Sequence, residues 1–216
     1  MAANLTHSSP ISRHLIATGN RLIRTRDLAD QYAEPSNETA RLVRRGILLK
    51  VANGYFLVVP EHRRDGTWRP AIEDLALALG VADYGAEESA LLGPSAARVL
   101  GSIPRALSSA LLAAPVHRSP LETRFGRIIF SARDAQRLDL QRYSGELTTG
   151  FCTTAEQTIL DLATNPTAAG ITEVLATEAR ATLLPMCDLR TVTRLARAQR
   201  NRKGLAIVLS EAEKLG

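Results

Sequence analysis

Three arginines in one short stretch carry the most specific chemistry in this sequence. Arg41, Arg44 and Arg45 follow a segment that opens with Ser36 and Asn37. On a helix, these guanidinium groups would lie on or near the exposed side, where they could bind phosphate oxygens or pair with guanine. Asn37 could pair with adenine in the same groove. The stretch therefore predicts a helix that enters the major groove of double-stranded DNA.

The flanking segments predict the elements that would position this helix. A short apolar strand at Leu22-Ile23 precedes a helix from about Thr25, its N-cap, to Tyr32. Glu34-Pro35 breaks the chain before a second helix, Asn37 to Arg45, which Ser36 is expected to cap. An earlier helix is expected to begin near Pro10 and end at Gly19.

A hairpin is predicted directly after the arginine-bearing helix. Apolar runs at 47–51 and 55–59 surround Asn53-Gly54, a strong signal for a two-residue turn. Helix, turn, helix and hairpin in this order indicate a winged helix-turn-helix over residues 1–60. The predicted DNA interface comprises Thr25, Arg26, Ser36, Asn37, Glu38, Thr39, Arg41, Arg44, Arg45, Lys50, Asn53 and Gly54. The core of the module is expected to include Ile11, Leu15, Ile16, Ala40 and Val43.

Charge is concentrated in two separate zones. The 216-residue chain has a net charge of +5, and its 45% apolar content is sufficient for buried cores. Residues 1–59 carry +4 and residues 188–203 carry +5, so the remainder is acidic. Two basic zones suit a polyanionic partner.

The second basic zone has helical spacing. Arg190, Arg194, Arg197 and Arg200 are separated by four, three and three residues, which would place them on one face of a helix. Such a face could bind phosphates outside the main site, dock an acidic partner, or simply be solvated.

The rest of the chain predicts a second domain. Residues 61–69 are polar and are expected to be a linker, and a mixed α/β domain is expected over 70–216. Its first helix would begin at Pro70, and Ser95 would cap a short helix. Four apolar runs, 110–116, 127–130, 138–140 and 147–151, predict a small antiparallel sheet.

The C-terminal end is predicted to be helical. Thr153 and Glu156 have capping-box spacing at the start of one helix. Further helices are expected over 168–183, over 189–199 behind Asp188, and over 204–215. The predicted fold class is therefore α+β: a winged helix-turn-helix, then a mixed domain with a small antiparallel sheet and a helical C-terminal end.

Catalytic and metal-binding patterns are not found. Cys152 and Cys187 lack the spacing of a zinc site or a disulfide framework, so both are expected to be ordinary thiols. The histidines share no metal-ligand spacing, and no glycine-rich phosphate motif or nucleophile elbow occurs. We expect no enzyme activity, no catalytic residues, no metal and no cofactor.

Without an apolar run of about 18 residues or a secretory signal, we expect a cytoplasmic protein with no membrane partner and a frayed tail at residues 1–10.

Several stretches together resemble the AbiEi family of antitoxins. They are the predicted wing with its Gly54-Tyr55, the segment Ala90 to Ala97, the strand ending near Phe130, and Thr153 to Leu162. The likeness covers about residues 11–200. It implies a protein that counteracts a nucleotidyltransferase-like toxin and represses the shared operon by binding inverted repeats in promoter DNA. The DNA contacts that it implies fall at Thr25, Arg26, 36–45 and 50–54.

The resemblance leaves the route of toxin neutralisation open. Direct contact, indirect antagonism and covalent modification such as phosphorylation are all compatible with it. One alternative is an interaction protein that acts on the toxin itself and uses the winged helix as a scaffold. Another is an enzyme that modifies the toxin, for which the sequence contains no kinase motif.

Overall fold

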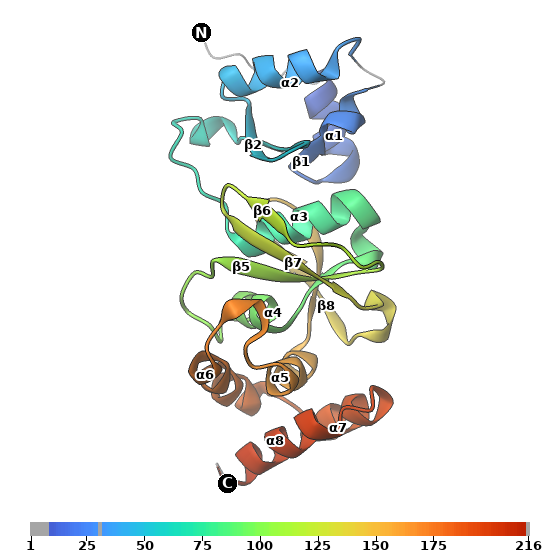
Figure 1. Cartoon of the computed structure of the whole chain (residues 1–216), viewed down its shortest axis with the longest axis vertical. Helices are drawn as coiled ribbons and strands as arrows, with labels where there is room; N and C mark the ends of the chain where they lie inside the picture. The colour runs from blue at the N-terminus through green and yellow to red at the C-terminus, as the bar shows by residue number, and fades with distance from the viewer. Residues whose placement is uncertain (1–8, 30–31, 215–216) are drawn as a thin grey trace.

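A computed structural model describes residues 9–29 and 32–214. The predicted α+β fold class is confirmed: helices and strands form an N-terminal module, a central sheet and a helical C-terminal end. These parts follow one another along the long axis of the molecule (Figure 1). Residues 1–8 of the predicted tail, part of the helix predicted over 25–32, and the last residue of the helix predicted over 204–215 lie outside the described residues.

The helices are α1 (Pro10–Thr18), α2 (Pro35–Arg44), α3 (Ile72–Tyr84), α4 (Gly93–Val99), α5 (Ala155–Thr164), α6 (Glu173–Leu183), α7 (Leu189–Ala198) and α8 (Arg202–Glu213). The strands are β1 (Leu22–Arg24), β2 (Leu48–Ala52), β3 (Tyr55–Val58), β4 (Ala90–Leu91), β5 (Ser109–Ala114), β6 (Leu121–Thr123), β7 (Gly126–Ala132), β8 (Leu140–Ser144) and β9 (Thr149–Thr153).

The N-terminal module has the predicted order of elements. Strands β1, β3 and β2 form an antiparallel sheet, and Gly54 takes the positive φ of 78° that the hairpin turn requires. Helix α1 begins behind the Ser9 cap and ends at Gly19, as expected. Ile11 is buried against this sheet, but Ile16 is 70% exposed. The prediction that Ile16 faces inward was wrong, because the nine-residue helix buries only the side of Ile11.

The two helices predicted on either side of Glu34-Pro35 differ from the prediction in their type or in their N-cap residues. The first is a four-residue 3₁₀ helix, Thr25–Leu28, with Arg24 rather than Thr25 at its N-cap. Helix α2 begins at Pro35 behind Glu34, so Ser36 is not its cap. Proline suits the first helical position because its φ is already helical and it has no N–H to satisfy.

Helix α2 packs on the sheet through a face that the sequence analysis misplaced. Thr39 and Leu42 are buried, Val43 is partly buried, and Ala40 is exposed. The Thr39 hydroxyl donates to the Ser36 carbonyl at 2.9 Å, which lets a polar residue occupy an inward position.

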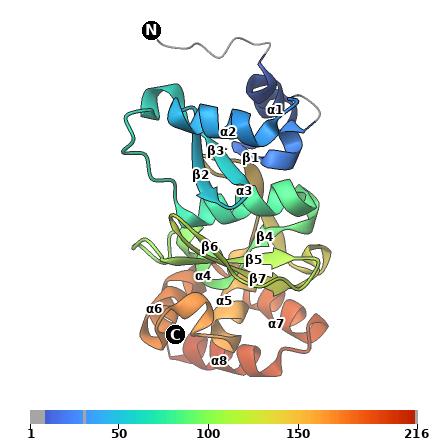
Figure 2. The ribbon, with the colours of Figure 1, turned by 45° about the horizontal axis from the view of Figure 1, so that its top comes forward.

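The larger sheet has six strands in the order β6-β7-β5-β4-β9-β8. It is mixed rather than antiparallel, because β5 pairs with β7 and β4 with β9 in parallel. Helix α3 lies between this sheet and the N-terminal module, and α4 to α8 lie on the sheet's other side (Figures 1 and 2). The predicted small antiparallel sheet is thus replaced by a larger mixed one.

The segment expected as a linker packs against the rest of the chain. Trp68 is 4% exposed, and its indole Nε1 donates to Glu146 Oε1 at 2.9 Å. The buried cluster that contains Trp68 also includes Leu22 and Val51 from the N-terminal module and Leu75 from α3. Helix α3 begins at Ile72 behind Ala71, two residues later than predicted.

Two predicted caps belong to other residues. Helix α4 begins at Gly93 behind Leu92, and the Ser95 hydroxyl instead accepts the backbone N–H of Leu111 at 2.7 Å. At α5 the cap is Thr154, whose hydroxyl accepts the Gln157 N–H at 3.3 Å. Thr153 belongs to β9 and bonds Thr158 within the core.

The position of the α5 cap leads to a stability prediction. Thr154→Ala is expected to lower the free energy of unfolding by about 1 kcal/mol, because the Gln157 N–H loses its partner. Thr154→Ser keeps the hydroxyl and should retain most of that stability. Urea denaturation measures both values, and equal losses in the two variants would contradict the assignment of the cap.

Near the C-terminus, the predicted helix over 168–183 is divided. A 3₁₀ turn, Ala168–Gly170, precedes α6, which Thr172 caps. Asp188 caps α7 as predicted, and its side chain accepts the Arg190 N–H.

Candidate nucleic-acid interface

Helix α2 lies at the end of the molecule farthest from α7 and α8, on the outer side of the small sheet (Figure 1). Arg44 and Arg45 are exposed on its C-terminal half, and Lys50 is exposed on the next strand. None of the three makes an ion pair with another described residue. These cations are therefore available to an external anion, and α2 lies away from the central sheet (Figure 1).

The N-terminal half of α2 is acidic and internally paired. Arg41 donates to both oxygens of Glu38, at 2.8 and 2.6 Å, and is 51% exposed. The hydrogen bond from Arg41 lowers the pKa of Glu38, and burial opposes this shift. Asn37 donates to the Glu34 carboxylate. The positive potential of this helix consequently lies toward Arg44 and Arg45.

The other residues of the predicted interface differ in their exposure and in their contacts with the rest of the chain. Thr39 lies on the inner side of α2, where it is buried and cannot contact an external partner. Thr25 donates its backbone N–H to the Gly54 carbonyl at 3.1 Å, which joins the 3₁₀ helix to the hairpin turn. Arg26 is 67% exposed and pairs with Asp83 of α3 at 3.2 Å. Ser36 and Asn53 are exposed.

The hairpin is docked rather than free to project. The Arg124 N–H donates to the Val51 carbonyl at 2.9 Å, so the edge of β2 is bonded to the loop after β6. Val51 is 3% exposed and shares a buried cluster with α3. The exposed side of the hairpin is therefore at Lys50 and Asn53.

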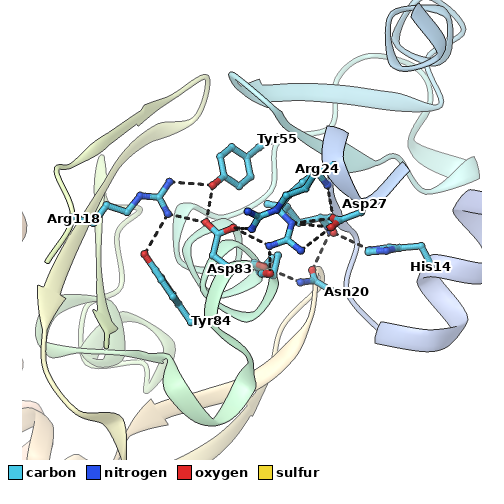
Figure 3. Close-up of polar contacts among 12 residues, drawn as sticks. His14, Asn20, Arg24, Asp27, Tyr55, Asp83, Tyr84 and Arg118 are labelled. Carbon is cyan, nitrogen blue, oxygen red and sulfur yellow. Dashed lines mark hydrogen bonds and ion pairs between the residues drawn. The ribbon is translucent and has the colours of Figure 1, made fainter. Parts of the chain in front are cut away.

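A network of charged groups joins the hairpin to α3 (Figure 3). Asp83 accepts from Tyr55 Oη at 2.6 Å and from Arg118 Nη1 at 2.7 Å. Its other oxygen accepts from Arg24 at 3.1 Å, and Arg24 also pairs with Asp27 at 2.7 Å. Asp83 is only 7% exposed, so these bonds form in a largely desolvated position.

The network shifts the titration of its members. Burial alone would raise the pKa of Asp83, but hydrogen bonds from Tyr55, Arg118 and Arg24 outweigh it and hold the pKa below its ordinary value. Burial and the bond to Asp83 raise the pKa of Tyr55. Arg118 also stacks over Phe130, with its guanidinium carbon 4.5 Å from the ring centroid. This cluster fixes the hairpin on the central sheet.

The two basic zones lie at opposite ends of the long axis (Figure 1). Arg190, Arg194 and Arg197 line one shallow recess on α7. Arg200 follows the end of α7 with a left-handed φ of 55° and lines a different pocket. The four arginines therefore do not form one helical face as predicted, and they do not extend the surface of α2.

Other classes of site have little support among residues 9–29 and 32–214. No group of three or more His, Cys, Asp or Glu side chains there could hold a metal ion. Cys152 and Cys187 are not joined in a disulfide, and burial raises the pKa of Cys187 to about 12. Within the described chain, no helix has the length and apolarity needed to cross a membrane.

Sequence reasoning missed the Asp83 cluster. Asp83 and Arg118 are 35 residues apart, and Tyr55 and Asp83 are 28 apart. No local pattern joins them, because the register of the folded hairpin against α3 creates the contact. The acidic residue Asp83, which follows the apolar middle of the helix 72–84, was a local signal for the cluster.

Comparison with known proteins shows the fold. No family model matches the chain, and no curated protein matches it. The crystal structure of the RV2827C protein from Mycobacterium tuberculosis is similar, with a TM-score of 0.61 and 18% sequence identity. The match covers 92% of this chain and 74% of that one. The two proteins thus share an architecture over nearly all of this chain.

Proposed function

We propose that this protein is a DNA-binding repressor of the antitoxin type, which binds promoter DNA through α2 and counteracts a nucleotidyltransferase-like toxin. The observation that carries the DNA-binding part is the pair Arg44 and Arg45, exposed and unpaired with other described residues on the outer helix of a winged-helix arrangement. Their guanidinium groups suit phosphate oxygens and guanine edges.

The antitoxin part of the proposal rests on the resemblance to the AbiEi family. It predicts inverted repeats upstream of the gene, a toxin gene beside it, and action in the cytoplasm. The proposal includes no enzyme activity, metal or cofactor.

A binding assay on the DNA immediately upstream of the gene tests this proposal. The whole chain should shift that DNA at concentrations on the order of 10 nM, and shuffled DNA of equal composition should need a concentration at least about 1,000 times higher. Equal affinity for both DNAs would contradict sequence-specific repression. If the neighbouring gene encodes the toxin, cells that express it alone should stop growing, and co-expression of this protein should restore their growth.

A second candidate function is favoured by the docking of the hairpin. The Arg124–Val51 bond and the Asp83 network hold the wing against α3, which would suit a scaffold that presents a surface to the toxin. This candidate predicts co-purification with the toxin and no shift of upstream DNA.

A further inference from the structure

A pocket of about 620 Å³ lies between the central sheet and the C-terminal helices. Its walls are the loop after β7, helix α5 and the turn between α7 and α8. The pocket is open to solvent on one side, and its volume is in the range that accommodates small organic ligands. Three arginines line it, Arg133, Arg137 and Arg200, together with Asp134 and the apolar side chains of Leu111 and Leu138. Arg137 is 86% exposed and pairs with Asp134 at 3.1 Å, so Arg200 is the arginine of the three that makes no ion pair with another described residue.

Asp161 orients Arg133 at the wall of this pocket. Arg133 Nη1 donates to Asp161 Oδ1 at 2.8 Å, and Gln157 Nε2 donates to the same oxygen at 3.1 Å. The aspartate side chain is 12% exposed, and its Oδ2 is buried without a hydrogen-bond partner among the described residues. Burial raises the pKa of Asp161, and the neighbouring guanidinium opposes that shift. A half-satisfied buried carboxylate is costly for the fold. We therefore regard Asp161 as a positioning residue for Arg133.

Arg200 is held in a conformation that normally selects glycine. Its φ is 55°, and it closes α7 with an N–H bond to the Arg197 carbonyl, while the Asn201 N–H reaches back to Ala196. Glycine is the usual residue at such a helix end because it adopts positive φ without strain. Here an exposed arginine occupies this position and lines the pocket. Glycine would be less strained at this position, and the arginine that replaces it places a guanidinium group at the pocket.

We propose that this pocket binds a nucleoside phosphate. Arg133, Arg137 and Arg200 would contact the phosphate, since guanidinium groups bind phosphate oxygens in pairs. The nucleoside would occupy the remaining volume against Leu111 and Leu138, where the side-chain amide of Asn165 can both donate to and accept from a base edge. The site lies far from α2 and does not depend on DNA binding.

Calorimetry on the full chain with AMP, GMP, CMP and UMP as probes tests this proposal. At least one of the four should bind with a Kd on the order of 0.1 mM or tighter. Its nucleoside and inorganic phosphate should each bind at least about tenfold more weakly, because each lacks one half of the contacts. No binding by any of the four, or equal affinity for phosphate alone, would overturn the proposal.

Variants distinguish the pocket from general electrostatic attraction. Arg200→Gly should keep Tm at or above the value of the parent protein, since glycine suits this φ, and should weaken nucleotide binding by at least about tenfold. Arg197→Gln removes an exposed cation from the preceding turn and should leave binding unchanged. Arg44→Gln should also leave it unchanged, which separates this site from the DNA surface. Equal weakening in Arg197→Gln or Arg44→Gln would refute the pocket.

Discussion

Asp83→Asn should lower the free energy of unfolding by about 3 kcal/mol. The substitution keeps the shape of the side chain but removes the charge that Arg24 and Arg118 share. Losing one member of a buried ion pair leaves its partners desolvated and unpaired. The expected loss is at the lower end of the usual range, because the two arginines are 20% and 26% exposed. Urea denaturation followed by circular dichroism measures the loss.

Glu122→Gln is the matched control for Asp83→Asn. Glu122 pairs with Arg127 at 3.1 Å, but both side chains are at least half exposed, so its loss should cost less than about 1 kcal/mol. Equal losses in the two variants would show that the Asp83 network contributes no more than a surface ion pair.

The contribution of Asp83 should depend on pH in a defined direction. Its folded-state pKa is depressed, so its stabilising effect is fully present above the unfolded pKa of about 3.9 and is lost as pH falls through the folded value. The difference in unfolding free energy between parent and Asp83→Asn should therefore be constant from about pH 5 to 7 and should shrink below about pH 4. A difference that grows on acidification would contradict this account.

The double substitution Arg44→Gln/Arg45→Gln should weaken binding to upstream DNA by roughly 25-fold at about 0.15 M salt, if each arginine contacts one phosphate. The plot of log affinity against log salt should become shallower by about 2, because two fewer counterions are released. Both side chains are exposed on α2 and unpaired with other described residues, so the fold should be unaffected. Fluorescence anisotropy over a salt series gives both values.

The control for this experiment is Arg194→Gln/Arg197→Gln. These arginines lie on α7 at the other end of the molecule and carry the same charge (Figure 1). They should leave affinity and salt slope unchanged, so an equal loss in both double variants would indicate attraction to net charge alone. A base contact by Arg44 would instead give a loss of about 1–3 kcal/mol confined to one position of the site.

Local signals predicted local structure well. Asn53-Gly54 indicated the hairpin because both residues tolerate positive φ, and Asp188 indicated the start of α7. The observed N-cap of α5 is Thr154 rather than the predicted Thr153, because adjacent threonines both carry a hydroxyl that could cap the helix. Sequence alone could not decide which of the two hydroxyls the strand would bury.

Features that depend on distant pairing were not predictable. The parallel pairing of β4 with β9 joins Ala90 to Phe151, and neither strand carries a signal for its partner. The same limit explains the Asp83 network and the pocket around Asp161, whose members come together only in the folded sheet. Exposure of Arg44 and Arg45 was predicted, although the inward face of the helix was placed at Ala40 rather than at Thr39 and Leu42.

Amide hydrogen exchange on the full chain, with and without its upstream DNA, tests the central claim most directly. Docking of α2 into a groove should slow exchange across residues 35–45 and leave residues 189–198 unchanged. Slower exchange confined to 189–198, or no change at 35–45 when the DNA is saturating, would contradict the assignment of α2 as the DNA-binding surface.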